Sequence, residues 1–265
     1  MVNKFIAREN FSSLDDFNKN CKIVVPENFN FAYDVADELA KTRPDGRALI
    51  WCNDKGEERH FTYAQMKYYS DKTANYLASL GIKKGDAVML ILKRRYEFWF
   101  CILALHKLGA IAVPATHLLT SNDLIYRNNA ASIKAVIAVA EDEVMEHIDD
   151  AQRKSPTLEL KIAVGDKCRE GWHDFNREME EASPDFQRPT GDMATVNSDI
   201  SLLYFTSGTT GQPKMVQHNF TYPLGHILTA KYWQNVRKDG LHLTVADTGW
   251  AKAVWGKLYG QWICE

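Results

Sequence analysis

The stretch Thr206-Ser207-Gly208-Thr209-Thr210-Gly211-Gln212-Pro213-Lys214 gathers hydroxyl side chains, two glycines and a terminal cation between two apolar runs. Small residues let backbone N–H groups turn toward a triphosphate, hydroxyls add donors, and a lysine supplies positive charge for oxyanions. The glycine spacing excludes the Walker A loop, which needs four residues between its glycines and a Gly-Lys-Ser/Thr ending. On composition alone, a phosphate cradle and a solvated hairpin loop fit this stretch equally well.

The residues before and after this stretch add to its specificity. Read from Tyr204 to Lys214, the string resembles the signature loop of the adenylate-forming superfamily, which includes acyl-CoA synthetases, luciferases and peptide-synthetase adenylation domains. In that family the loop binds the β- and γ-phosphates of ATP while a carboxylate attacks the α-phosphate. Met215 replaces a common glycine, and Met-Val followed by a polar residue and His218 is similar to the short- and medium-chain acyl-CoA synthetases. The ATP-binding residues that the resemblance implies are Thr206, Ser207, Gly208, Thr209, Thr210, Gly211, Gln212, Pro213 and Lys214.

Composition indicates an ordinary globular protein. The chain has 265 residues, 45% of them hydrophobic, and a net charge of −2, which gives no electrostatic reason to expect nucleic acid or an anionic membrane as a partner. Residues 1–20 lack the apolar core of a signal peptide, and no apolar run is long enough to span a membrane. The five cysteines are widely spaced, as in reduced cytosolic proteins, and no His/Cys cluster suggests a metal. We therefore expect a cytoplasmic protein.

Alternating strands and helices predict a doubly wound α/β domain. The apolar run 88–92 has the length and pattern of a strand buried on both faces, which favours a parallel sheet. Thr62 is expected to cap a helix that ends at Gly81, and Ser121 another with Asp123 in its first turn. Strands are predicted at 48–52, 59–61, 88–92, 110–113, 135–139, 160–164, 200–205, 214–218 and 241–245. Further helices are predicted at 14–20, 31–43, 96–108, 141–151 and from 219 or 221 to 234.

The polar, turn-rich stretch 180–199 is the best linker candidate. We predict a first α/β subdomain with an N-terminal arm over residues 1–190, and the start of a second, carrying the phosphate loop, over 191–265. The resemblance covers most of residues 45–265, including Phe61-Thr62-Tyr63 and Lys107-Leu108-Gly109-Ala110. It implies the N-terminal part of a large α/β domain of layered, parallel-type sheets with flanking helices, followed in the family by a small C-terminal domain.

A second motif, Ala246-Asp247-Thr248-Gly249-Trp250, follows the predicted strand 241–245. Ligands of α/β sheets bind where strands end. The motif resembles an Asp-x-Gly-Trp segment of acyl-CoA synthetases, and the resemblance implies that Gly249 and Trp250 border the carboxylate pocket. Without the motif, Trp250 and Trp255 would be read as core aromatics. Lys252 could meet a substrate carboxylate or extend to solvent, and His218 could contact the pocket or belong to the hairpin.

The chain ends at Glu265 within an amphipathic or buried segment, without a stop signal, so we expect a cut chain. In the family, the adenine-binding segments, the acidic residue that helps place Mg²⁺ and the catalytic lysine lie further along. The resemblance implies an acid:CoA ligase that uses ATP, Mg²⁺ and CoA, with no catalytic residue and no metal ligand in this stretch and no turnover by the fragment.

Two alternatives remain open. The chain could be a truncated, non-catalytic remnant that binds a nucleotide or a partner, or an enzyme that loads a carrier protein rather than CoA. An apolar face left uncovered by a missing half would also cause self-association.

Overall fold

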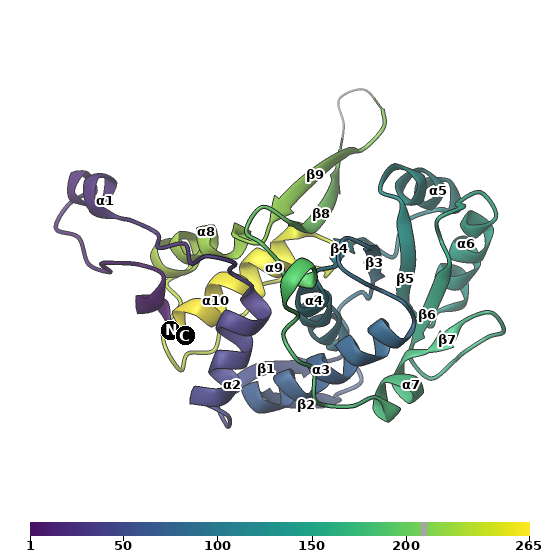
Figure 1. Ribbon diagram of the computed structural model, residues 1–265, viewed down its shortest axis with the longest axis horizontal. Coiled ribbons are helices and arrows are strands. Elements are labelled where there is room, and N and C mark those ends of the chain that lie inside the picture. The colour runs from purple at the N-terminus through teal and green to yellow at the C-terminus, as the bar shows by residue number, and fades with distance from the viewer. Residues whose placement is uncertain (208–210) are drawn as a thin grey trace.

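A seven-stranded sheet forms the centre of the molecule (Figure 1). The computed structural model describes residues 1–207 and 211–265. The strands of this sheet are β3 (Ala87–Ile91), β4 (Ile111–Pro114), β5 (Ile133–Val139), β6 (Leu160–Val164), β7 (His173–Asp174), β8 (Ile200–Thr206) and β9 (Lys214–Asn219). Their order is β7-β6-β5-β3-β4-β8-β9, and all neighbours are parallel except β8 and β9. The predicted α/β class with a mainly parallel sheet is confirmed.

Helices cover both faces of the sheet. On one side lie α3 (Tyr63–Ser79) and α4 (Glu97–Leu108), and on the other α5 (Ser121–Ala130) and α6 (Asp142–Gln152) (Figure 1). Successive strand residues point to opposite faces. Accordingly, Val88 and Leu90 of β3 pack in the apolar cluster with α3 and α4, whereas Met89 and Ile91 pack in the cluster with α5 and α6. All residues of β3 are buried, which explains its continuous apolar run.

Capping residues set the helix ends. Thr62 starts α3 through a capping box with Gln65, as its position before the helix predicts. The cap of α5 is Thr120, one residue before the predicted Ser121, and it forms a capping box with Asp123. Gly109 ends α4 in the left-handed conformation with φ of 73°, where a Cβ would be unfavourable.

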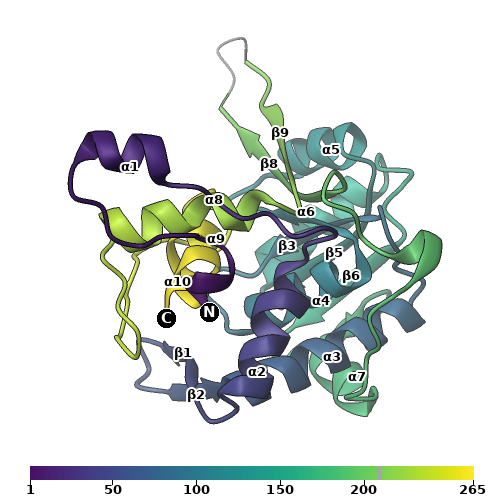
Figure 2. The ribbon, with the colours of Figure 1, turned by 60° about the vertical axis from the view of Figure 1, so that its left-hand side comes forward.

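The first 62 residues form an arm and a hairpin. The arm contains η1 (Val2–Lys4) and α1 (Leu14–Asn20), which lies near α8 (Tyr222–Leu228) (Figure 2). It packs on the body through Phe11 and Phe17, whose rings contact Tyr232. After it come η2 (Ala32–Asp37) and α2 (Glu38–Thr42), which together form the helix predicted to end before Pro44. The hairpin is also confirmed: β1 (Arg47–Cys52) pairs antiparallel with β2 (Glu58–Thr62).

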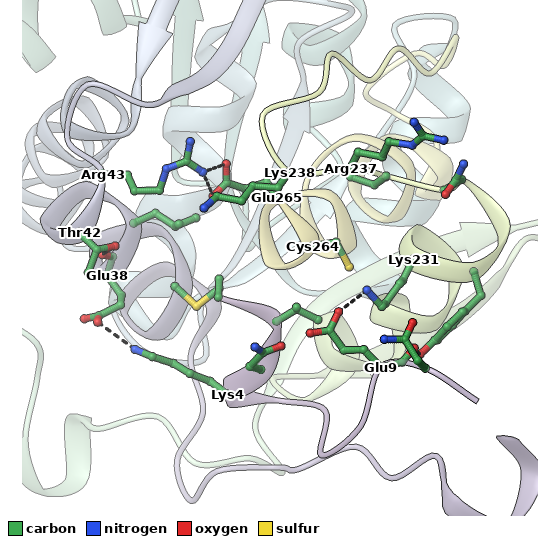
Figure 3. A pocket seen from close by; sticks show the side chains of 18 residues that line it. Lys4, Glu9, Glu38, Thr42, Arg43, Lys231, Arg237, Lys238, Cys264 and Glu265 are labelled. Carbon is green, nitrogen blue, oxygen red and sulfur yellow. Dashed lines mark hydrogen bonds and ion pairs between the residues drawn. The ribbon is translucent and has the colours of Figure 1, made fainter. Parts of the chain in front are cut away.

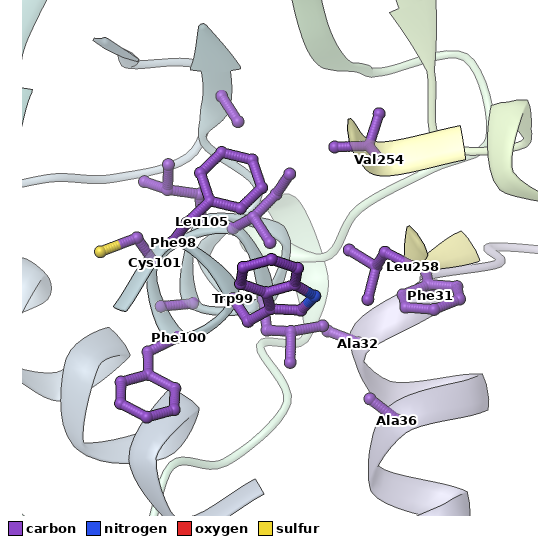
Figure 4. Packing of buried hydrophobic residues seen from close by; sticks show 14 of the residues in the cluster. Phe31, Ala32, Ala36, Phe98, Trp99, Phe100, Cys101, Leu105, Val254 and Leu258 are labelled. Carbon is purple, nitrogen blue, oxygen red and sulfur yellow. The ribbon is translucent and has the colours of Figure 1, made fainter. Parts of the chain in front are cut away.

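Trp99 of α4 belongs to the core, as predicted for an aromatic on a buried helix. Its side chain is only 5% exposed and lies among Phe31, Ala32, Leu105 and Leu258 (Figure 4). Every residue of α4 from Glu97 to Leu108 is buried, including Lys107, which pairs with Asp37 and Asp71.

The last part of the chain is mostly helical. It contains α8 (Tyr222–Leu228), η4 (Thr229–Trp233), α9 (Ala251–Lys257) and α10 (Tyr259–Cys264). The helix predicted from Thr221 is confirmed, with Thr221 as its N-cap and Pro223 in its first turn. Between α7 (Phe175–Glu181) and β8, the only element among the described residues is η3 (Gly191–Met193). The subdomain boundary near residue 190 stays a prediction, although strands from both sides of it share one sheet.

The strand predicted at 241–245 is wrong. These residues have no regular secondary structure, and nothing in the described ranges pairs with their backbone as a strand. Leu241, Leu243 and Val245 are 73%, 84% and 83% exposed, whereas Thr244 is buried and donates its hydroxyl to the carbonyl of Gly256 at 2.7 Å. The alternation of a strand is present in the sequence, but a strand forms only where a neighbour supplies the hydrogen bonds.

Candidate functional site

One edge of the sheet collects the ends of four parallel strands. Strands β5, β3, β4 and β8 are neighbours in this order, so their carboxyl ends lie on the same edge. The chain leaves β3 toward β4 on one side, and then crosses to β5 on the other side of β3. Ligands of open α/β sheets bind at such a change of direction, outside the carboxyl ends of the strands. Both predicted motifs lie at this edge.

The phosphate motif lies at the tip of the β8–β9 hairpin. Thr206, the last residue of β8, pairs with Lys214, the first residue of β9. Thr206, Ser207, Gln212 and Lys214 are exposed, and in the described part of the chain Lys214 forms no ion pair. Gly211 has a φ of 98°, which favours glycine over any other residue. Thr206, Ser207 and Lys214 are therefore exposed at the end of β8, and Pro213 is half-buried beside them. The predicted residues Gly208, Thr209 and Thr210 lie outside the described residues.

Helix α5 supports this hairpin from one side. The Tyr126 hydroxyl donates a hydrogen bond of 2.9 Å to the carbonyl of Pro213, and its ring meets that of Phe205 edge to face at 6.2 Å. The Arg127 guanidinium lies 5.4 Å from the centre of the Phe205 ring. These contacts fix the base of the loop relative to α5. Sequence analysis missed Tyr126 and Arg127, because nothing in the helix pattern distinguishes them from surface residues.

The second motif forms a tight turn at the start of α9. The Gly249 amide donates to a carboxylate oxygen of Asp247 at 2.9 Å, and the Trp250 amide donates to the Asp247 carbonyl at 3.1 Å. Trp250 is the N-cap of α9, and 64% of it is exposed, so it is not a core aromatic in this structure. Lys252 is also exposed, as expected of a side chain that reaches solvent.

The turn is held against the ends of β3 and β4. The Thr248 amide donates to the carbonyl of Lys93 at 3.1 Å, and the Thr248 hydroxyl donates to the same carbonyl. Gly249 lies against the backbone of Ala115 and Thr116, which follow β4. The structure therefore brings the turn of the second motif to the same sheet edge as the end of β8. Lys93 and Thr116 hold this turn of the candidate site, and the sequence carried no signal for either residue.

A row of aromatic and imidazole rings connects the hairpin to α9. His218 of β9 packs on Tyr222 with ring centres 3.9 Å apart, Tyr222 contacts His226 at 4.5 Å, and His226 stacks on Trp255 at 6.0 Å. Burial lowers the pKa of His226 to about 4 and also lowers the pKa of His218. The row is therefore uncharged at neutral pH. Within this row, Tyr222 and His226 are four residues apart on one face of α8, a spacing that sequence analysis missed.

A polar groove near the two chain ends contains none of the predicted site residues (Figure 3). It has a volume of about 840 Å³, and most of its charges are paired. Lys4 pairs with Glu38, and Arg43 pairs with Glu265. Lys231 likewise pairs with Glu9. Because these cations are already neutralised by carboxylates of the same groove, we do not assign it the phosphate chemistry.

Two further properties concern metals and membranes. Among the described residues, no group of three or more His, Cys, Asp or Glu side chains is arranged to hold a metal ion. The helices in the described ranges are too short or too polar for any of them to cross a membrane.

Curated relatives match almost the whole chain. The rat mitochondrial acyl-coenzyme A synthetase ACSM5 is 37% identical over 245 residues, which are 90% of this chain and 41% of the relative. The human mitochondrial acyl-coenzyme A synthetase ACSM3 is 32% identical over 268 residues, 98% of this chain and 45% of the relative. The chain thus spans less than half of the length of these relatives. Their mitochondrial location corrects our expectation of a cytoplasmic protein, since the absence of a secretion signal does not separate the two compartments.

Solved structures share the fold. The anthranilate CoA ligase AuaEII, determined with anthranoyl-AMP, superposes with a TM-score of 0.76 at 26% identity, covering 91% of this chain and 44% of the ligase. A Brucella canis acyl-CoA synthetase superposes with a TM-score of 0.77 at 21% identity, covering 89% of this chain and 41% of the synthetase. The family model described as AMP-binding enzyme matches residues 36–260. The chain therefore belongs to the family of AMP-binding enzymes, as its phosphate motif predicts.

Proposed function

We propose that the protein in its whole length is an acid:CoA ligase. It activates a short- or medium-chain carboxylic acid with ATP to acyl-AMP and pyrophosphate, and then transfers the acyl group to the thiol of CoA. Membership of the AMP-binding family and similarity to acyl-coenzyme A synthetases support the reaction class. The similar fold of a ligase solved with an acyl-adenylate supports the first half-reaction.

One observation carries the proposal: the exposed residues Thr206, Ser207 and Lys214 lie at the end of β8, on the edge that also holds the turn 247–250. Lys214, Thr206 and Ser207 would hold the β- and γ-phosphates. A carboxylate oxygen of the acid attacks the α-phosphorus and pyrophosphate leaves. The CoA sulfur then attacks the acyl carbon and AMP leaves. Catalysis of such displacements relies on positioning and charge neutralisation, so no nucleophile of the protein is needed.

Mg²⁺ fits the chemistry of the phosphates but not the donors of the described residues, which offer no carboxylate cluster for it. We therefore assign it no ligand in this chain. We also propose that the 265-residue chain does not turn over by itself, because one phosphate loop supplies only part of the charge neutralisation that the reaction needs.

The test is acid-dependent exchange of pyrophosphate into ATP by the full-length gene product, over a series of aliphatic and aromatic acids. The Lys214→Ala variant should lose about 10²- to 10³-fold in kcat/KM for ATP, the range found when one transition-state donor is removed. Lys19→Ala, in the exposed arm helix α1, is the matched control and should leave the rate unchanged.

The thiol acceptor separates the remaining alternatives. Release of AMP with free CoA supports the proposal, whereas transfer only to a carrier-protein thiol favours the carrier-loading reading. Nucleotide binding without exchange for any acid would contradict the ligase and indicate a non-catalytic remnant.

A further inference from the structure

We propose that Thr248 and Gly249 are positioning residues that fix Trp250 at the sheet edge, and that the carbonyl of Lys93 is their anchor. We name Lys93, Ala115, Thr116, Thr248 and Gly249 the edge clamp. The structural part of this proposal stands alone, and its consequence for acid binding rests on the proposed function.

The anchor has an unusual backbone. Lys93 follows β3 and has a φ of 50°, a conformation that is unfavourable for a residue with a Cβ. Its carbonyl accepts two hydrogen bonds from one residue, the amide of Thr248 at 3.1 Å and the Thr248 hydroxyl. Its side chain forms an ion pair with Glu141, which follows β5. The left-handed turn thus presents the carbonyl to Thr248 while the side chain remains tied to the neighbouring strand.

Gly249 forms the second half of the clamp. A Cβ placed on it would lie 2.6 Å from the Ala115 carbonyl oxygen, closer than real side chains allow. The φ of Gly249 is not in the positive range, so glycine is needed here for space rather than for conformational freedom. Close approach of two backbones is a recurrent reason for glycine at a ligand edge. The turn can therefore approach the end of β4 this closely only if residue 249 has no side chain.

The clamp decides where Trp250 lies. Thr248 is fully buried, whereas Trp250 is 64% exposed, so packing of the indole contributes little to its own position. What holds Trp250 is backbone: its amide donates to Asp247, and its carbonyl accepts from Ala253 at 2.9 Å. Both ends of this short turn depend on the clamp at the carboxyl ends of β3 and β4, on the sheet edge where ligands of open α/β sheets bind. A shift there would move Trp250 without disturbing the β8–β9 hairpin.

The first experiment measures amide hydrogen exchange in the 265-residue chain. In Thr248→Val the amides of residues 248–250 should exchange about tenfold faster, as expected from the loss of one buried hydrogen bond. Thr248→Ser keeps the hydroxyl and should stay within twofold of wild type. Thr73→Val is the matched control, because Thr73 is equally buried and donates its hydroxyl at 2.7 Å within α3. Equal exchange in Thr248→Val and wild type would overturn the clamp.

The second experiment uses the full-length enzyme. Thr248→Val should raise KM for the acid about tenfold and leave KM for ATP within twofold, and Thr248→Ser should restore the acid KM. Gly249→Ala should have a larger effect than Thr248→Val, while Gly225→Ala, a helical glycine with open space around its Cβ position, should have none. Parallel losses for acid and ATP would contradict a positioning role. An inactive wild type would contradict the proposed function instead, and the exchange experiment would still decide the clamp.

Discussion

Residues 87–91 and 241–245 are both apolar-rich runs of strand length, yet only the first forms a strand. The run 87–91 is β3, hydrogen-bonded to β4 on one side and β5 on the other. The run 241–245 has no strand partner within the described ranges, and its apolar side chains face outward. A side-chain pattern therefore specifies which face of a segment can be buried, whereas a neighbouring backbone decides whether the segment becomes a strand.

The largest expected difference concerns stability. Leu90 in β3 is fully buried, and Leu243 is 84% exposed. Leu90→Ala should lower the free energy of unfolding by about 2 to 5 kcal/mol, because it leaves a cavity between sheet and helices. Leu243→Ala should change it by less than about 0.5 kcal/mol. Chemical denaturation of both variants measures this contrast, and similar losses at the two sites would show that residues 241–245 are packed in solution.

The stability of the buried helix α4, which packs on β3, should also depend on pH. His106 of α4 is buried, its ring bonds the Tyr259 hydroxyl at 2.7 Å, and burial lowers its pKa from 6.5 to about 3. Between these two values the unfolded chain binds more protons than the folded one, so stability is present above pH 6.5 and is lost as pH falls. Acidification from pH 6.5 to 4.5 should lower the free energy of unfolding by about 2 kcal/mol through this residue.

Unfolding free energies at several pH values test this dependence. His106→Gln should flatten the slope in that window, whatever it does to stability at neutral pH. His60→Gln is the control, because its side chain is 58% exposed on β2. An unchanged slope in His106→Gln would assign the acid sensitivity to other groups.

The exposed residues 241–245 should affect self-association of the chain more than its free energy of unfolding. Leu241, Leu243 and Val245 form an apolar row next to a groove of about 830 Å³ that also borders β1. We expect the 265-residue chain to self-associate through this surface. Replacing all three by Ser should shift the chain toward monomer with little change in unfolding free energy.

Sedimentation over a range of concentrations measures this shift. The control is the double replacement of Val24 and Val25 by Ser, since both are about half exposed on the N-terminal arm. A wild-type chain that remains monomeric at all concentrations would contradict the expectation.

Local signals predicted most of the fold. Buried runs such as 160–164, and caps such as Thr62, act within a few residues, and the structure has both where predicted. Strand β7 has two residues, too few to produce a pattern.

The residues of the candidate site could be predicted from the sequence only where they belong to a recognisable motif. The sequence motifs located the β8–β9 loop and the turn 247–250, but not what holds them. The bonds of Tyr126 to Pro213 and of Thr248 to Lys93 join residues far apart in the chain, so no local pattern reports them. The exposure of Trp250 likewise depends on tertiary structure, because the same side chain would be buried if other elements packed over it.

The antiparallel β8–β9 pair has a consequence for folding kinetics. Its strands are close in the chain, so the hairpin can form within microseconds. Its docking onto β4, where Ala112 pairs with Leu202, requires closure of a much longer loop and must come later. Strands β8 and β9 can thus pair early, while the sheet edge that holds the candidate site exists only once the parallel sheet has assembled.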